Sequence, residues 1–113
     1  MRAIKTPNWS IYSDTPRFFS GNLKHFLHLR DPICRIPYCD ATTTTIDHVT
    51  PAHTGGPTTA ANAAGLCARH NHTKEHPGWR TTITNTGLTG TGPHRIHITT
   101  PTQRTYHSTA PPI

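Results

Sequence analysis

Two pairs of potential metal ligands constrain the fold of this chain more than any other feature. Cys34 and Cys39 form one close pair, and Cys67 and His70 form another after the intervening segment 40–66. At structural sites Zn²⁺ binds four nitrogen or sulfur ligands at the corners of a tetrahedron, and two close pairs can supply them. Closing the loop between the pairs would tie distant parts of the chain together. The sequence therefore predicts a structural zinc site formed by these four residues.

The composition explains why such a site would be needed. Only 32% of the 113 residues are hydrophobic, and 11 prolines and 8 glycines interrupt the rest. A chain with so little apolar surface tends to remain open unless a covalent or metal link holds it. Three cysteines cannot all pair within one chain, and residues 1–10 lack the apolar region of a signal peptide. We therefore expect a reduced, cytoplasmic protein in which clustered Cys and His bind metal.

Two alternatives remain open for this cluster. The cysteines could be ordinary buried side chains, and His72 or His76 could take the place of His70 as fourth ligand. Four protein ligands leave no open coordination position, so such a site is expected to be structural. Any catalysis must then come from other residues.

The charge balance is compatible with a nucleic-acid partner. Eleven Lys and Arg against five Asp and Glu give a formal net charge of +6 with neutral histidines. This suits a phosphate backbone, although many small basic proteins bind no nucleic acid. No stretch approaches the length of an apolar membrane-spanning helix, so we expect no membrane partner.

An amphipathic helix is predicted near the start of the chain. In residues 22–30, apolar side chains recur at helical spacing. This places Leu23, Phe26 and Leu27 toward a small core and leaves Arg30 largely outward.

The middle of the chain alternates between strand and helix signals. The β-branched run 42–49 predicts a strand that ends before Pro51. Thr58 or Thr59 is positioned to cap a helical turn, and residues 66–76 predict a second short helix that ends at Pro77–Gly78.

The last third of the chain has the residue pattern of β-strands joined by turns. Alternating β-forming residues and turn signals predict a hairpin or small meander within residues 79–107. Its apolar side chains would cover the zinc-bearing part of the chain; they are Trp79, Ile83, Ile96 and Ile98. Residues 108–113 are expected to form a frayed tail.

A second group of polar residues lies close to the proposed zinc ligands. Asp47 and His48 are adjacent at the end of the predicted strand, and Asn62 and Asn71 follow. Adjacent strand residues point to opposite faces, so a twist or bulge before Pro51 would be needed for both to serve one site. A carboxylate suits Mg²⁺ or Mn²⁺, and a neutral imidazole can take a proton from water.

At these residues the chain resembles the HNH endonucleases of the ββα-metal fold. It is most similar to the zinc-containing HNH domains at the C-termini of actinobacterial DUF222 (13E12 repeat) proteins. The matching segments are RDPICRIPYCD, IDHVTPAHTGGPT, LCARHNHTK and PGW, together with Asn62, and the likeness spans about residues 22–113.

This resemblance implies a small α+β domain, stabilised by zinc, with a short N-terminal helix and a C-terminal β-hairpin. The expected organisation is an irregular leader, an HNH core, a hairpin extension and a tail, at residues 1–21, 22–78, 79–107 and 108–113.

The resemblance also implies roles for individual residues. His48 would be the general base and Asn62 would brace the loop that holds it, so these two form the catalytic pair. Asp47 and Asn71 would bind one catalytic Mg²⁺ or Mn²⁺, with Asn71 at a position where close relatives usually have His. Cys34, Cys39, Cys67 and His70 match the structural zinc ligands.

The resulting prediction is hydrolysis of phosphodiester bonds in DNA. Backbone contacts are expected from Arg35, Arg69, Lys74 and Arg80. The alternative is a zinc-stabilised DNA-binding module without catalysis, such as a decayed nuclease or a fragment of a larger DUF222-type protein. A protein-interaction zinc ribbon is a third interpretation, and it leaves the Asp47–His48 pair unexplained.

Overall fold

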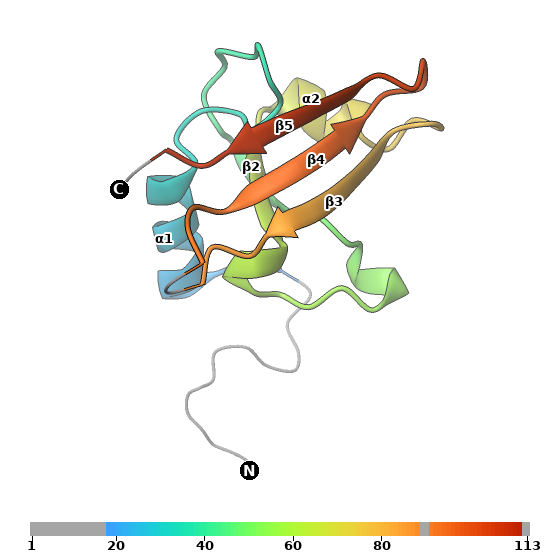
Figure 1. The fold of residues 1–113 in the computed structure, drawn as a ribbon. Helices are drawn as coiled ribbons and strands as arrows, with labels where there is room; N and C mark the ends of the chain where they lie inside the picture. Colours follow the sequence, from blue (N-terminus) through green and yellow to red (C-terminus); the bar gives the residue numbers. More distant parts are fainter. Residues whose placement is uncertain (1–17, 89–90, 112–113) are drawn as a thin grey trace.

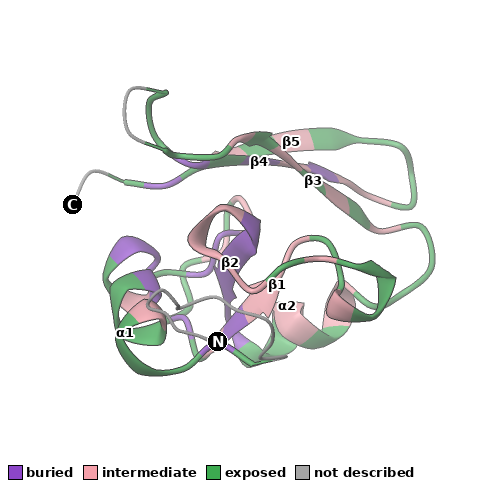
Figure 2. Cartoon of the chain, turned by 90° about the horizontal axis from the view of Figure 1, so that it is seen from below, coloured by how far each residue is buried: buried purple, intermediate pink, exposed green. Residues whose placement is uncertain are grey.

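The computed structural model describes residues 18–88 and 91–111, which form two packed layers (Figures 1 and 2). Most of the predicted leader, residues 1–17, lies outside the described residues. Both sheets are antiparallel and the helices are few, so the predicted α+β class is confirmed. No helix in the described ranges combines the length and the apolar character needed to cross a bilayer.

The first layer contains a two-stranded sheet and two helices. Helix α1 (Gly21–Arg30) precedes β1 (Thr45–His48), and two short 3₁₀ helices, η1 (Ala52–Thr54) and η2 (Ala60–Asn62), follow it. Strand β2 (Ala63–Leu66) pairs antiparallel with β1, and α2 (Ala68–Thr73) comes directly after β2. The order is therefore strand, strand, helix.

The second layer is a three-stranded antiparallel sheet in the order β3–β4–β5, with bounds Arg80–Asn85, Arg95–Thr99 and Thr105–Thr109. Its inner face covers the first layer, as Figure 2 shows. Ile96 and Ile98 are each 1% exposed and pack with Ala64 of β2. Trp79 and Ile83 join the same cluster, so the predicted covering role of these apolar residues is confirmed.

Several predicted boundaries differ from the structure. Strand β1 begins at Thr45 rather than at residue 42, because Thr42 makes only an isolated bridge to Ile33. Helix α2 ends at Thr73, whereas the predicted helix continued to residue 76, just before Pro77. The prediction of a cap at Thr59 is confirmed, since its side chain accepts a hydrogen bond from the Asn62 N–H.

The C-terminal part is a meander and not a two-stranded hairpin. Its third strand, β5, continues to Thr109, so the predicted tail of 108–113 is wrong for its first residues. Ala110 is also buried, and its N–H donates a hydrogen bond to His94 O. The last two residues, 112–113, lie outside the described part.

Helix α1 forms where it was predicted, but its outer and inner faces differ from the expectation. Leu27 is fully buried against Phe19 and Ile46. Phe26 is 43% exposed, so its predicted inward position is wrong. Arg30, predicted to face outward, is buried because its guanidinium donates hydrogen bonds to Asp31 and to backbone carbonyls of the first layer.

Asp31 is the centre of a buried polar network that joins the two layers. Its carboxylate is paired with Arg30 Nη2 at 2.7 Å and with Arg35 Nη1 at 3.1 Å. It also accepts a hydrogen bond from the Gly65 N–H at 2.9 Å. Gly65 permits this approach, because a Cβ there would lie 2.7 Å from Asp31 Cβ. The network thereby fixes the turn after α1 against β2.

Candidate functional site

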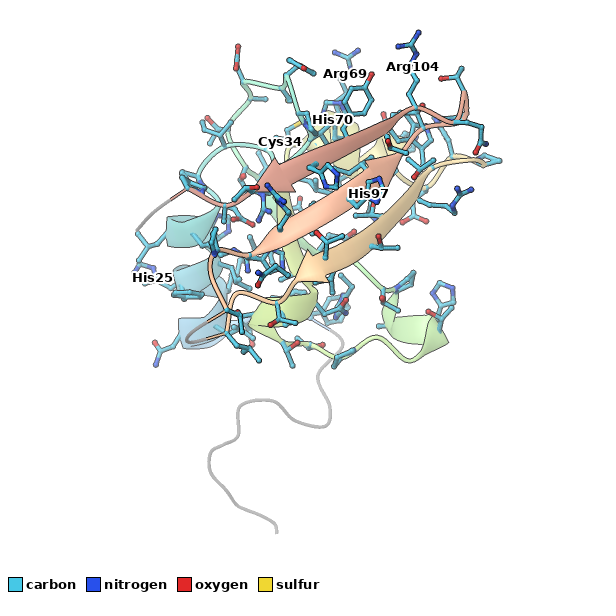
Figure 3. All side chains as sticks on the ribbon, in the orientation of Figure 1. His25, Cys34, Arg69, His70, His97 and Arg104 are labelled. Carbon is cyan, nitrogen blue, oxygen red and sulfur yellow. The ribbon has the colours of Figure 1, made fainter. Side chains whose placement is uncertain are left out.

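The four predicted zinc ligands converge in the first layer. Cys34 and Cys39 come from the turn that follows α1, Cys67 is the N-cap residue of α2, and His70 lies in the first turn of that helix. Their ligand atoms all lie within 4.8 Å of one another. Figure 3 shows Cys34 and His70 together behind β5.

The separations of these atoms match a tetrahedral zinc site. Zn–S bonds of about 2.3 Å and Zn–N bonds of about 2.0–2.1 Å place tetrahedral sulfur ligands about 3.8 Å apart and S–N pairs about 3.6 Å apart. The Cys39 and Cys67 sulfurs are 3.9 Å apart. His70 Nδ1 lies 3.6 Å from Cys34 Sγ and 3.5 Å from Cys67 Sγ. The four residues can therefore hold a metal ion such as zinc.

The choice among the histidines is also resolved by the geometry. His72 and His76 pack ring to ring, with centroids 5.7 Å apart, and neither belongs to the group of converging ligand atoms. The three cysteines are free thiols in the described structure, so none is used in a disulfide.

The environment of the thiols differs from one to the next. Burial raises the pKa of Cys34 to about 11. The His70 N–H, which donates to Cys67 Sγ at 3.5 Å, lowers the pKa of Cys67. Burial and the neighbouring Arg69 lower the pKa of His70, so its imidazole is neutral and able to bind a metal.

Asp47 and His48 lie at the end of β1 and both line one cavity of about 570 Å³. The cavity extends from this strand to Trp79 and Arg80 at the start of β3. On one side, Lys74 Nζ approaches the Asp47 carboxylate to 2.5 Å. Burial opposes the charge on Lys74, but hydrogen bonds from its ammonium to Asp47 and Glu75 outweigh this and raise its pKa. The Asp47 carboxylate is thus already paired with a cation at the C-cap of α2.

His48 is held in a defined orientation. Its Nε2 shares a hydrogen bond of 2.9 Å with Thr58 Oγ1, and its ring lies 4.6 Å from the Phe19 ring, centroid to centroid. Thr58 belongs to the loop between β1 and β2, and Phe19 precedes α1. Contacts from two separate segments therefore limit the rotation of the imidazole.

Asn62 spans the loop that follows His48. Its Oδ1 accepts a hydrogen bond from the Thr50 N–H at 2.8 Å. Its Nδ2 donates to Thr50 O at 3.0 Å and to Pro57 O at 2.8 Å. The side chain is 3% exposed and its amide is bonded on both atoms, so it closes the loop at two points. Asn62 therefore bridges the loop after His48, and the catalytic role that the resemblance implies for it stays a prediction.

Asn71 lies on α2, half-buried, with its N–H bonded to Cys67 O. It is three residues before Lys74, so the two residues share a face of the helical turn. Among the described contacts of the Asp47 carboxylate, the cationic partner is Lys74, the C-cap residue of α2, and no described bond joins Asn71 to Asp47. Binding of one ion by Asp47 and Asn71 therefore stays a prediction.

The predicted DNA contacts divide into two groups. Arg69 and Arg80 are exposed, and Lys74 is half-buried in its pair with Asp47. Arg35 is 4% exposed, and its guanidinium bonds to Asp31, Ser108 and His94, so the expected backbone contact from Arg35 is wrong. Burial and ion pairing make it a structural residue.

The polar residues that hold this arrangement, above all Asp31 and His94, were not predicted from the sequence. His94 is 3% exposed, its Nε2 lies 2.9 Å from Ala61 O, and its Nδ1 lies 3.1 Å from Arg35 Nη1. One signal could have pointed to Asp31: it is an acid between Arg30 and the first cysteine in a chain with few acids.

Comparison with known proteins gives one curated relative. The chain is 41% identical over 64 residues to an uncharacterized protein of Mycobacterium tuberculosis (strain ATCC 25618 / H37Rv), Rv3776. The match covers 54% of this chain but only 12% of the relative, so the chain spans a small part of that protein's length. No family model matches the chain, and no solved structure matches it.

Proposed function

We propose that this domain is a metal-dependent endonuclease of the HNH type that hydrolyses phosphodiester bonds in DNA. The observation that carries the proposal is the set of three hydrogen bonds, one accepted and two donated, that the Asn62 side chain makes across the loop after His48. These bonds fix the loop that follows Asp47 and His48, and this pair lines a cavity together with Lys74 and residues 75–82.

In this proposal His48 is the general base. Its neutral imidazole takes a proton from the attacking water, whose oxygen forms a bond to phosphorus while the bond to the 3′ oxygen breaks. The leaving oxygen receives a proton from solvent. Thr58 and Phe19 keep the ring in place during this transfer. Asn62 acts as a positioning residue, since it touches the loop and not the reacting atoms.

Asp47 is the residue that would hold the catalytic Mg²⁺ or Mn²⁺; in the structure its carboxylate is paired with the Lys74 ammonium. Asn71, on the same helical face as Lys74, would supply a carbonyl oxygen as second ligand. When bound, the ion supplies charge stabilisation for the phosphate. Lys74 would then turn from Asp47 toward the DNA backbone.

The test is a plasmid nicking assay with Mg²⁺ or Mn²⁺. General-base catalysis contributes about 10²- to 10⁴-fold, so His48→Ala is expected to lower the nicking rate by at least about 100-fold. His25→Ala, on the exposed face of α1, is the matched control and should nick like the parent protein. Equal rates for the parent and His48→Ala would refute the assigned base.

One observation favours a second candidate, a zinc-stabilised DNA-binding module without catalysis. The Lys74 ammonium occupies the Asp47 carboxylate, which a catalytic cation would need. Binding of duplex DNA with no nicking in either metal would select this module.

A further inference from the structure

The three-stranded sheet has an outer face that nothing in the described chain covers. Figure 2 shows this face directed away from the first layer, and Figure 3 shows His97 upon it. Along β4 the buried residues Ile96 and Ile98 alternate with Arg95, His97 and Thr99 on the outer side. Because successive side chains of a strand point to opposite faces of the sheet, Arg95, His97 and Thr99 lie together on the outer face.

The outer face is entirely polar, and every charged or titratable side chain on it is basic. Its members on the three strands are Arg80, Thr82, Thr84, Arg95, His97, Thr99, Thr105, His107 and Thr109. No Asp or Glu follows Glu75 in the sequence, so no carboxylate from this part of the chain can neutralise the arginines. The face lacks an apolar anchor of the kind that protein interfaces use, which favours a polyanion over a protein partner.

Two contacts organise the side chains of this face. His97 and His107 are direct cross-strand neighbours, and their rings stack with centroids 4.7 Å apart at an angle of 19°. Arg95 Nε donates a hydrogen bond of 3.0 Å to Thr109 Oγ1, which lays the arginine across β5. His97 Nε2 is buried without a hydrogen-bond partner in the described structure, so the phosphate contacts of this face are assigned to the arginines and threonines and not to this nitrogen.

The outer face is continuous with the cavity that contains Asp47 and His48. Arg80 and Thr82 of β3 line that cavity and also belong to the outer face. In the register of the sheet, Arg80 pairs with Thr99, which is four residues from Arg95 along β4. Four residues of strand span about 14 Å. Along duplex DNA this corresponds to about four phosphates of one strand at 3.4 Å each.

We propose that the outer face of β3–β4–β5 binds the sugar–phosphate backbone of duplex DNA beside the scissile phosphate. The position relative to the scissile phosphate rests on the proposed nuclease function, but the binding itself does not. Arginine and threonine side chains contact phosphate oxygens without reading sequence, so this surface positions the DNA and adds no base specificity. The proposed DNA-binding surface extends from Arg80, at the rim of the cavity, to Arg95.

Binding is measured by fluorescence anisotropy of labelled duplex DNA, in the His48→Ala background so that cleavage cannot interfere. Each phosphate contact contributes about 0.9 to the slope of log K against log salt, so Arg95→Ala should lower the magnitude of that slope by about 0.9. The Arg80→Ala/Arg95→Ala pair should lower it by about 1.8. Arg95→Lys, which keeps the charge, should retain the parent slope.

Lys24→Ala is the matched control, because it removes one exposed positive charge from α1, in the other layer. If Arg95→Ala changes the slope no more than Lys24→Ala does, the proposal is overturned. Equal binding of oligoglutamate and DNA at the same charge would also overturn it in favour of an acidic protein partner. A lower slope for Arg95→Ala, together with no nicking by the protein that retains His48 in Mg²⁺ or Mn²⁺, would support this surface while refuting the nuclease function.

Discussion

The burial of a neutral histidine between the two layers should make the stability of the domain fall in mild acid. His94 fits its site only when uncharged. Its Nε2–H donates to Ala61 O, and its Nδ1 accepts from the Arg35 guanidinium. A second proton would have to sit on Nδ1, directly against Arg35. Burial first, and then the positive charges of Arg30 and Arg35, lower the pKa of His94 to about 4.

The sign and size of the effect follow from this lowered pKa. The folded state holds His94 neutral down to about pH 4, whereas in the unfolded chain it takes up a proton below its ordinary pKa of 6.5. The contribution is therefore fully present above about pH 6.5 and is lost as the pH falls toward 4. With these two pKa values, the free energy of unfolding should drop by about 2 kcal/mol between about pH 7.5 and 5, and by about 3 kcal/mol at pH 4.

The assay is urea denaturation followed by tryptophan fluorescence, for the parent protein and for His94→Gln at the same metal content. The glutamine amide can still donate to Ala61 O but does not titrate. The difference between the two free energies at each pH cancels the titration of all other groups, so it isolates His94. His25→Ala, an exposed histidine, should follow the parent at every pH. A gap between parent and His94→Gln that stays constant from about pH 7.5 to 5 would refute the reasoning.

Two further predictions concern the buried charges and the metal. Asp31→Asn leaves two buried guanidinium groups without a counter-charge, so urea denaturation should show a loss of about 3–5 kcal/mol, and a loss below about 1 kcal/mol would contradict the network described above. The purified protein should contain one zinc per chain by elemental analysis. Cys67→Ser should lose it, whereas His72→Ala should keep it; zinc loss in the second variant would contradict the assignment of the fourth ligand.

The sequence was informative where spacing determines geometry. Cys34, Cys39, Cys67 and His70 could be predicted because a tetrahedral ion accepts close pairs of ligands at these separations. Their convergence within 4.8 Å agrees with that prediction. The apolar residues of the last third were also correct, because alternation along a strand decides which side chains face the core.

The sequence was less informative where burial overrides local preference. Ala63–Leu66 forms a strand although alanine favours helices, because pairing with β1 and full burial outweigh the propensity. Arg35 reads as a surface cation, and only the fold reveals the carboxylate of Asp31 beside it. A basic side chain gives no sign in the sequence of whether its partner is a phosphate or a buried acid.

The network around Asp31 has a consequence for how the domain unfolds. Arg35 reaches from the cysteine-bearing turn to Ser108 of β5 and to His94 before β4, so one side chain joins both layers. Layers that share such a link open together, as a single cooperative unit. A change that stabilises or destabilises the domain should then alter the rate of amide hydrogen exchange in β2 and in β5 by the same factor. Removal of a metal ion bound by Cys34, Cys39, Cys67 and His70 in the first layer should likewise speed amide exchange in the second layer.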